Sequence, residues 1–133
     1  MEGKSYVRHG VFIEGVELFG NDLFGIVPGE AAVMAPEQRH LLEVVLMTAL
    51  GARWERAGMG CSSTGCFIGQ EPTDWRGVVS SGSPYSATGG ALSISSNRVS
   101  FVFGLQGGSM TIDTACSASL VALDSGGRWL STG

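Results

Sequence analysis

The sequence predicts a layered α/β protein, because helical and strand-like segments alternate along the chain. The expected order is helix, strand, loop, helix, strand, helix. The helix between the two strands would carry the chain from one to the other, so we expect the strands to be parallel. The chain has 133 residues, of which 44% are hydrophobic and 15% charged. This composition fits one core-forming domain, or part of one.

The clearest helix is expected over residues 36–50. Pro36 suits the first helical position, where its missing N–H costs nothing. Gly51 is a suitable stop signal. Residues 41–50 are apolar almost all round, which is typical of a helix buried against several neighbours.

The remaining elements are shorter and are set off by glycines. We expect an irregular lead-in over 1–17, a strand over 64–69, a loop over 77–90, a helix from about Ser93 to Phe103, a strand over 109–114 and a helix after Cys116. Gly126 and Gly127 would weaken that last helix by roughly 1 kcal/mol each relative to alanine.

Composition excludes several classes of function. The net charge is −4, from 8 basic and 12 acidic side chains, and no basic cluster predicts a nucleic-acid partner. No apolar run approaches the ~20 residues of a membrane span, and the N-terminus lacks a stretch of signal-peptide type. The three cysteines favour reduced thiols in a reducing compartment, which we expect to be the cytoplasm, with organelle targeting left open. Cys61 and Cys66 have no nearby pair of ligands to complete a metal site, so we expect none.

Cys116 lies between a predicted strand and a predicted helix. A strand that turns sharply into a helix presents its turn residue at the sheet edge, where ligands bind in open α/β sheets. The positive end of the helix favours the thiolate, the nucleophilic form of cysteine. The backbone N–H groups of Cys116 and Ser117 are candidate donors to the oxyanion of a tetrahedral intermediate. These features indicate thioester or acyl chemistry.

Two other interpretations of Cys116 compete with this one. From spacing alone, a buried structural cysteine fits equally well, because free cysteines are often buried. A hydrolase-type elbow needs glycine two residues to either side of its nucleophile, and Thr114 and Ala118 stand there instead. The sequence does not identify residues that bind the substrate.

Several separate motifs, in the right order, resemble the ketosynthases of modular polyketide synthases. The run TIDTACSASLVAL, residues 111–123, is similar to the segment around the nucleophile of that family. Four more segments resemble family motifs: LFGI at 23–26, MAPEQR at 34–39, SSNRVSF at 95–101 and GLQG at 104–107. The resemblance covers about residues 18–131.

This resemblance implies the N-terminal half of a thiolase-like fold, incomplete and spanning residues 18–133. It implies that Cys116 accepts an acyl chain from the phosphopantetheine arm of an acyl carrier protein, with no cofactor bound to the chain itself. The acyl chain is then condensed with a malonyl-type extender, as in polyketide and fatty-acid synthesis, with loss of carbon dioxide. It also implies a homodimer in the complete domain and a C-terminal half as partner.

Departures from the family pattern favour an alternative. The two catalytic histidines of the family lie downstream of these residues, and His9 and His40 match neither. The first strand of the family fold is missing or replaced by residues 1–17. Ala35 stands where an aspartate commonly caps the helix, which forfeits roughly 1 kcal/mol. Asp124 stands where the family often has histidine, and the glycines after it would interrupt the last helix. The chain therefore resembles a fragment or a degraded copy, inactive by itself, and the alternative function is a non-catalytic interaction or dimerisation fragment.

Overall fold

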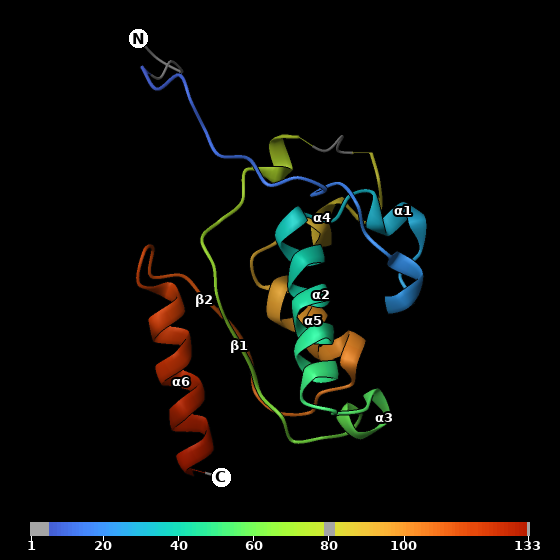
Figure 1. Cartoon of the computed structure of the whole chain (residues 1–133), viewed down its shortest axis with the longest axis vertical. Helices are drawn as coiled ribbons and strands as arrows, with labels where there is room; N and C mark the ends of the chain where they lie inside the picture. Colours follow the sequence, from blue (N-terminus) through green and yellow to red (C-terminus); the bar gives the residue numbers. More distant parts are fainter. Residues whose placement is uncertain (1–5, 79–81, 133) are drawn as a thin grey trace.

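The structure is a computed structural model that describes residues 6–78 and 82–132 (Figure 1). Residues 6–20 form no helix or strand. The helices are α1 (Pro28–Ala31), α2 (Pro36–Gly51), α3 (Arg56–Met59), α4 (Ser86–Gly89), α5 (Ile94–Phe103) and α6 (Ala118–Thr132), and the strands are β1 (Cys66–Gly69) and β2 (Ser109–Ile112). Single 3-10 turns lie at Asn21–Phe24 and Trp75–Gly77.

The two strands pair in parallel, as the alternation of elements predicts. Cys66 lies opposite Ser109, and Gly69 lies opposite Ile112. The crossover helix α5 packs against one face of the strands, and α6 packs against the other (Figure 1). Helix α2 packs on the outside of α5. The fold is therefore layered α-β-α with a second helix outside, and within the described residues the sheet has two strands.

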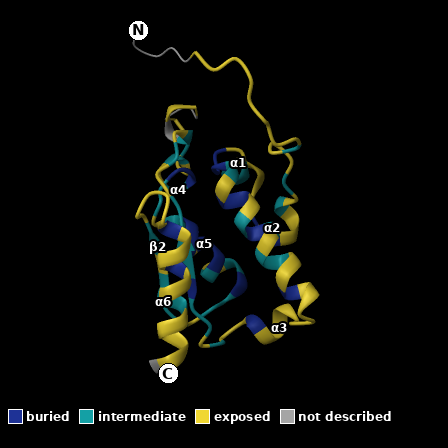
Figure 2. Cartoon of the chain, turned by 60° about the vertical axis from the view of Figure 1, so that its left-hand side comes forward, coloured by how far each residue is buried: buried dark blue, intermediate teal, exposed yellow. Residues whose placement is uncertain are grey.

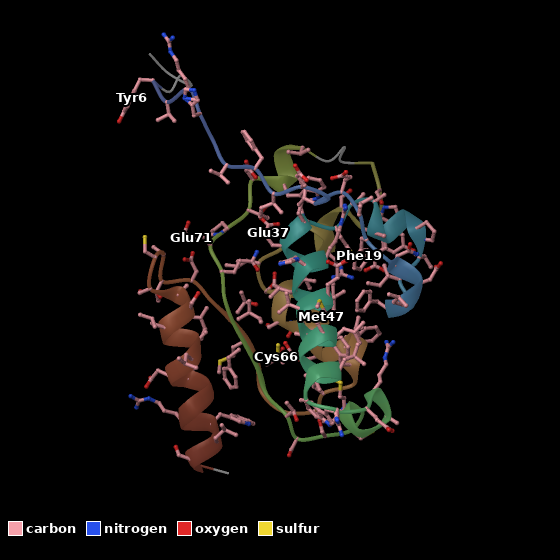
Figure 3. The ribbon with its side chains drawn as sticks, in the orientation of Figure 1. Tyr6, Phe19, Glu37, Met47, Cys66 and Glu71 are labelled. Carbon is pink, nitrogen blue, oxygen red and sulfur yellow. The ribbon has the colours of Figure 1, made fainter. Side chains whose placement is uncertain are left out.

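Helix α2 begins at Pro36, as expected, and ends at Gly51, one residue beyond the expected end. The expected burial against neighbours is present on one side of the helix and not on the other. On the inner side of α2, Leu42 is fully buried, whereas on the outer side Met47 is 71% exposed (Figure 3). Because α2 lies in the outer layer, its inner side alone packs against α5 (Figure 2).

Both strands are shorter than expected, for a local reason at each end. Thr64 lies before β1, where its carbonyl oxygen accepts a hydrogen bond from the Gly107 N–H at 3.0 Å. Asp113 and Thr114 already belong to the turn that follows β2. The expected loop over 77–90 contains the short helix α4, and its residues 79–81 lie outside the described part of the chain.

Helix α6 runs without a break through Gly126 and Gly127, so the expected interruption is wrong. The reason is packing against the sheet. A Cβ added at Gly126 would lie 3.6 Å from the ring of Phe67, so this glycine faces the sheet. Three residues further on, the ring of Trp129 packs against Phe67 with centroids 6.0 Å apart. Tertiary contacts of this kind commonly outweigh weak helix propensity.

The core lies between α2, α5 and the strands, and a polar cluster around Arg98 lies within it. The buried guanidinium of Arg98 on α5 donates to Oε1 of Gln38 on α2 at 2.9 Å and forms an ion pair with Glu30. Gln38 in turn donates to the carbonyl oxygen of Thr88 at 3.1 Å. These bonds tie α1, α2, α4 and α5 together and satisfy a cation that would otherwise be costly to bury. Among the described residues, no helix is long and apolar enough to cross a membrane.

The start of α2 has no side-chain cap, because its N-cap residue is Ala35. The backbone N–H of Ala35 instead donates to the carbonyl oxygen of Gly89 at 2.7 Å. Three residues into the helix, the buried Arg39 donates from Nε to the carbonyl oxygen of Met34 at 3.1 Å and lies over the ring of Trp75. Burial lowers the pKa of this guanidinium from its usual value. The helix start is therefore fixed by packing and backbone bonds.

Candidate active site

Cys116 lies in the turn that joins the end of β2 to the start of α6, and it is exposed. One residue, Ser117, separates it from the first residue of α6. The expected placement at the junction of a strand and a helix N-terminus is therefore present. A thiol here is accessible to a substrate and close to the N–H groups of the first helical turn, which favour negative charge.

The turn is held in a strained backbone conformation by the residues around Cys116. Ala115 has φ of 53°, in the left-handed region that alanine rarely adopts. The carboxylate Oδ1 of Asp113 accepts a hydrogen bond from the Ala115 N–H at 3.0 Å, which braces this conformation. The sharp change of direction at Ala115 sends the chain from β2 into α6 with Cys116 at the bend.

Ser117 closes the other side of the turn. Its hydroxyl donates to the carbonyl oxygen of Thr114 at 2.8 Å and lies 3.0 Å from Thr114 Oγ1. Its backbone N–H donates to the same carbonyl oxygen at 3.3 Å, which is long for such a bond. The role of the Cys116 and Ser117 N–H groups as oxyanion donors stays a prediction.

The carboxyl ends of both strands meet at the edge where Cys116 lies. The N–H of Gln70, which follows β1, donates to the carbonyl oxygen of Ile112 at 3.1 Å. Glu71 lies beyond the same end of β1 (Figure 3). Ligands of open α/β sheets bind at this edge.

A hollow of about 840 Å³ runs along the flank of α6 beside β1. Apolar side chains make up most of its lining, among them Leu41, Phe67, Ile68, Leu123 and Trp129. It extends as far as Ser119 in the first turn of α6, but Cys116 does not line it. The hollow therefore adjoins the helix that follows Cys116 without containing the thiol.

The other two cysteines differ from Cys116 in their surroundings. Cys66 is buried in β1, and this burial raises the pKa of its thiol, an effect that a hydrogen bond with Ser100 partly opposes. Cys61 is exposed in the loop after α3, before β1 begins, and so at the other end of the strand from the Cys116 turn. Among residues 6–78 and 82–132, His, Cys, Asp and Glu side chains form no group that could hold a metal ion.

Neither histidine belongs to the turn or to the sheet edge. His9 lies in the exposed lead-in, before the first helical turn. His40 lies on α2, where its side chain is 75% exposed and its Nδ1 is 3.8 Å from a carboxylate oxygen of Glu43.

Two supporting residues are not singled out by the sequence. Asp113 braces Ala115, and the spacing of an aspartate two residues before the braced N–H is a signal that could have found it. Gly69 ends β1 and lies directly against the backbone of Ala118. This second contact joins residues far apart in the chain, so local sequence patterns do not reveal it.

Known proteins share both the sequence and the fold of this chain. The family described as "Beta-ketoacyl synthase, N-terminal domain" matches residues 1–133. The spectinabilin polyketide synthase system protein NorC of Streptomyces orinoci is 42% identical over 125 residues, which is 91% of this chain and 6% of that protein. A highly reducing polyketide synthase of Pyrenophora dematioidea is 44% identical over 140 residues, 98% of this chain and 5% of that protein.

Solved ketosynthases have the same arrangement of elements. The oxazolomycin ketosynthase domain OzmH KS7 of Streptomyces albus JA3453 superposes with a TM-score of 0.83 at 29% identity, covering 100% of this chain and 24% of that one. The ketosynthase from module 6 of the bacillaene synthase of Bacillus subtilis 168 gives a TM-score of 0.75 at 26% identity, covering 88% and 20%. The thiolase-like fold is thereby confirmed for the part of a ketosynthase that these residues span. The chain belongs to the β-ketoacyl synthase family and corresponds to its N-terminal domain.

Proposed function

We propose that this chain supplies the acyl-accepting part of a polyketide ketosynthase, with Cys116 as the nucleophile. The observation that carries the proposal is the position of Cys116. It is exposed beyond the carboxyl end of β2, in a braced turn and two residues before the first residue of α6. Membership of the β-ketoacyl synthase family supports the same assignment.

The first step is transfer of an acyl group between two thiols. The thiolate of Cys116 attacks the carbonyl carbon of an acyl thioester on the phosphopantetheine arm of an acyl carrier protein. The backbone N–H groups of Cys116 and Ser117 stabilise the oxyanion that forms. The carbon–sulfur bond to phosphopantetheine then breaks, and the released thiolate takes up the proton that Cys116 gave up. The products are acyl-Cys116 and a free carrier thiol.

The second step is condensation, and it needs groups beyond those of the Cys116 turn. A malonyl-type extender loses its carboxylate as carbon dioxide and becomes an enolate. The enolate carbon attacks the carbonyl of acyl-Cys116, a carbon–carbon bond forms, and the bond to Cys116 sulfur breaks. We assign stabilisation of the enolate to the two histidines of the complete ketosynthase domain. In that domain the C-terminal half would contact this chain, and the complete domain would form a homodimer. Neither His9 nor His40 is in the Cys116 turn.

The acyl-transfer step can be tested on the chain as it exists. The purified 133-residue chain would be incubated with a short acyl thioester, and each cysteine-containing peptide would then be mapped by mass spectrometry. We expect slow acylation of Cys116 that is abolished by Cys116→Ala. Cys61→Ala is the matched control, because Cys61 is also exposed but does not precede a long helix. Acylation of Cys61 at the rate of Cys116, or none at Cys116, would contradict the assignment.

A second candidate function, an interaction fragment without chemistry, is favoured by exposed apolar side chains of α6. Leu120, Leu123 and Leu130 are 71%, 73% and 83% exposed, and the last two also line the hollow beside β1. Apolar patches of this kind commonly mark contact surfaces. The two candidates differ in the role of the thiol. An interaction fragment would associate equally well after Cys116→Ala and would show no acylation to lose. The acyl-accepting chain loses its acylation in the same variant.

A further inference from the structure

Gly69 lies closer to α6 than any other residue type would allow. A Cβ added to Gly69 would lie 2.4 Å from the carbonyl carbon of Ala118, 2.5 Å from its oxygen and 2.5 Å from the nitrogen of Ser119. All three are backbone atoms of the first turn of α6, so no side-chain rotation relieves the contact. The φ of Gly69 lies outside the left-handed region, so its own backbone would accept alanine. The requirement for glycine is therefore set by α6.

The same glycine also pairs with the strand that leads to Cys116. Gly69 lies opposite Ile112, the last residue of β2, and Ile112 precedes Cys116 by four residues. Ala118 follows Cys116 by two residues. Gly69 thus contacts the chain before the turn, at Ile112, and after the turn, at Ala118. Since Cys116 lies between these two residues, its position depends on how far apart they are held.

The far end of α6 is held separately. Trp129 packs on the ring of Phe67, and its indole lies against Gly108, where an added Cβ would meet the ring at 3.1 Å. A side chain at position 69 would push on the first turn of α6 while this contact holds its last turns. The displacement would therefore be largest at the helix start, next to Cys116.

We propose that Gly69 is a positioning residue for Cys116, setting the height of the first turn of α6 over the sheet and with it the placement of the thiol and the neighbouring N–H groups. The inference rests on the proposed function of Cys116. Acyl transfer needs the thiolate and the oxyanion donors to face the same thioester carbonyl at the correct distances. Displacements of about 1 Å can cost on the order of 100-fold in rate.

The test compares Gly69→Ala with Gly127→Ala in the full 133-residue chain. Both variants add one methyl group, but beyond the adjacent residues and backbone of α6 no heavy atom lies within 4 Å of the position that a Cβ would take at Gly127. The rate of acylation of Cys116 by a short acyl thioester is measured for each variant. Iodoacetamide labelling of the buried Cys66 is measured in the same samples, because this thiol becomes accessible only when the fold opens.

We expect acylation of Cys116 to fall about tenfold or more in Gly69→Ala, with Cys66 still protected and with Gly127→Ala equal to the wild type. Equal acylation of Gly69→Ala and wild type would overturn the proposal, as would an equal loss in Gly127→Ala. Labelling of Cys66 at the rate of Cys61 in Gly69→Ala would also overturn it, because Gly69 would then act on the whole fold. No acylation of wild-type Cys116 is a different result, since it refutes the proposed function itself.

Discussion

The ring of Trp129 on α6 packs against the ring of Phe67 on β1, with centroids 6.0 Å apart and planes tilted by 55°. Gly65, just before β1, makes room for this contact, because an added Cβ would lie 3.3 Å from the indole nitrogen of Trp129. The contact anchors the second half of α6 on the sheet. It explains why the helix continues through two glycines whose intrinsic propensity disfavours helix.

Gly127 is a position where the fold would gain stability from a side chain. Gly127→Ala should raise the free energy of opening of the fold by about 1 kcal/mol. The reason is that it removes a glycine from a helix interior without creating a contact with another element. The free energy of opening is measured as the protection of Cys66 from alkylation, at a fixed protein concentration. Gly104→Ala is the opposing control and should reduce protection, because Gly104 has φ of 72°. Reduced protection in Gly127→Ala would show that α6 is not a regular helix there.

Local sequence signals predict the larger elements but not the contacts that fix them. Pro36 marks the start of α2 through its own backbone chemistry, so sequence suffices there. The end is different, because Gly51 is still helical and the left-handed residue after the helix is Arg53, with φ of 54°. The partners of Arg39 could not be predicted in this way. Its spacing from Glu43 suggests an ion pair on α2, whereas its guanidinium lies over Trp75 and binds backbone carbonyls.

The candidate site shows the same division. Cys116 is found from its local setting, because a strand, a small-residue turn and a helix follow one another directly in the chain. The contact between Gly69 and the first turn of α6 joins residues more than forty positions apart. No local sequence pattern predicts that contact. Long-range packing of this kind follows from the three-dimensional register of β1 and β2.

The three cysteines should differ in their reaction with iodoacetamide. Cys116 should react fastest, by about two- to fivefold over Cys61, because the start of α6 stabilises negative charge by about 0.3–1 kcal/mol. Cys66 should react slowest, because it is buried and burial raises the pKa of its thiol. Time-resolved mass-spectrometric mapping of the three peptides gives the rates. Equal or slower labelling of Cys116 in the folded chain would refute its assignment as the nucleophile.

Cys66 should also make the fold sensitive to alkaline pH. Burial raises its pKa in the folded chain, so the fold favours the neutral thiol. This contribution to stability is fully present below the ordinary pKa of a thiol and is lost as pH rises through the raised pKa of the folded state. The urea midpoint of the helical circular dichroism signal should therefore fall between about pH 8 and 10, and it should fall less in Cys66→Ala. An equal fall of the urea midpoint with rising pH in wild type and Cys66→Ala would show that Cys66 is not the cause of the alkaline sensitivity.

The exposed leucines of α6 should make the isolated chain associate. Burying such a side chain contributes about 1.5–3 kcal/mol, so contact between copies is favourable. Sedimentation velocity should show concentration-dependent association of the wild type, weakened about tenfold or more by Leu123→Ser. Leu50→Ser is the matched control, because Leu50 is similarly exposed but lies on α2. A monomeric wild type that melts cooperatively would contradict this expectation.

The most direct test of the account offers the purified chain both an acyl thioester and a malonyl-loaded carrier protein. Loading of Cys116 needs a thiolate and backbone donors, which we propose that the turn supplies. Condensation also needs stabilisation of an enolate, and loss of even one oxyanion donor typically costs on the order of 10²–10³ in rate. We therefore predict that acyl-Cys116 accumulates slowly, disappears in Cys116→Ala, and gives no β-ketoacyl product. A β-ketoacyl product that depends on Cys116 would contradict the account, because the condensing machinery would then lie within these 133 residues.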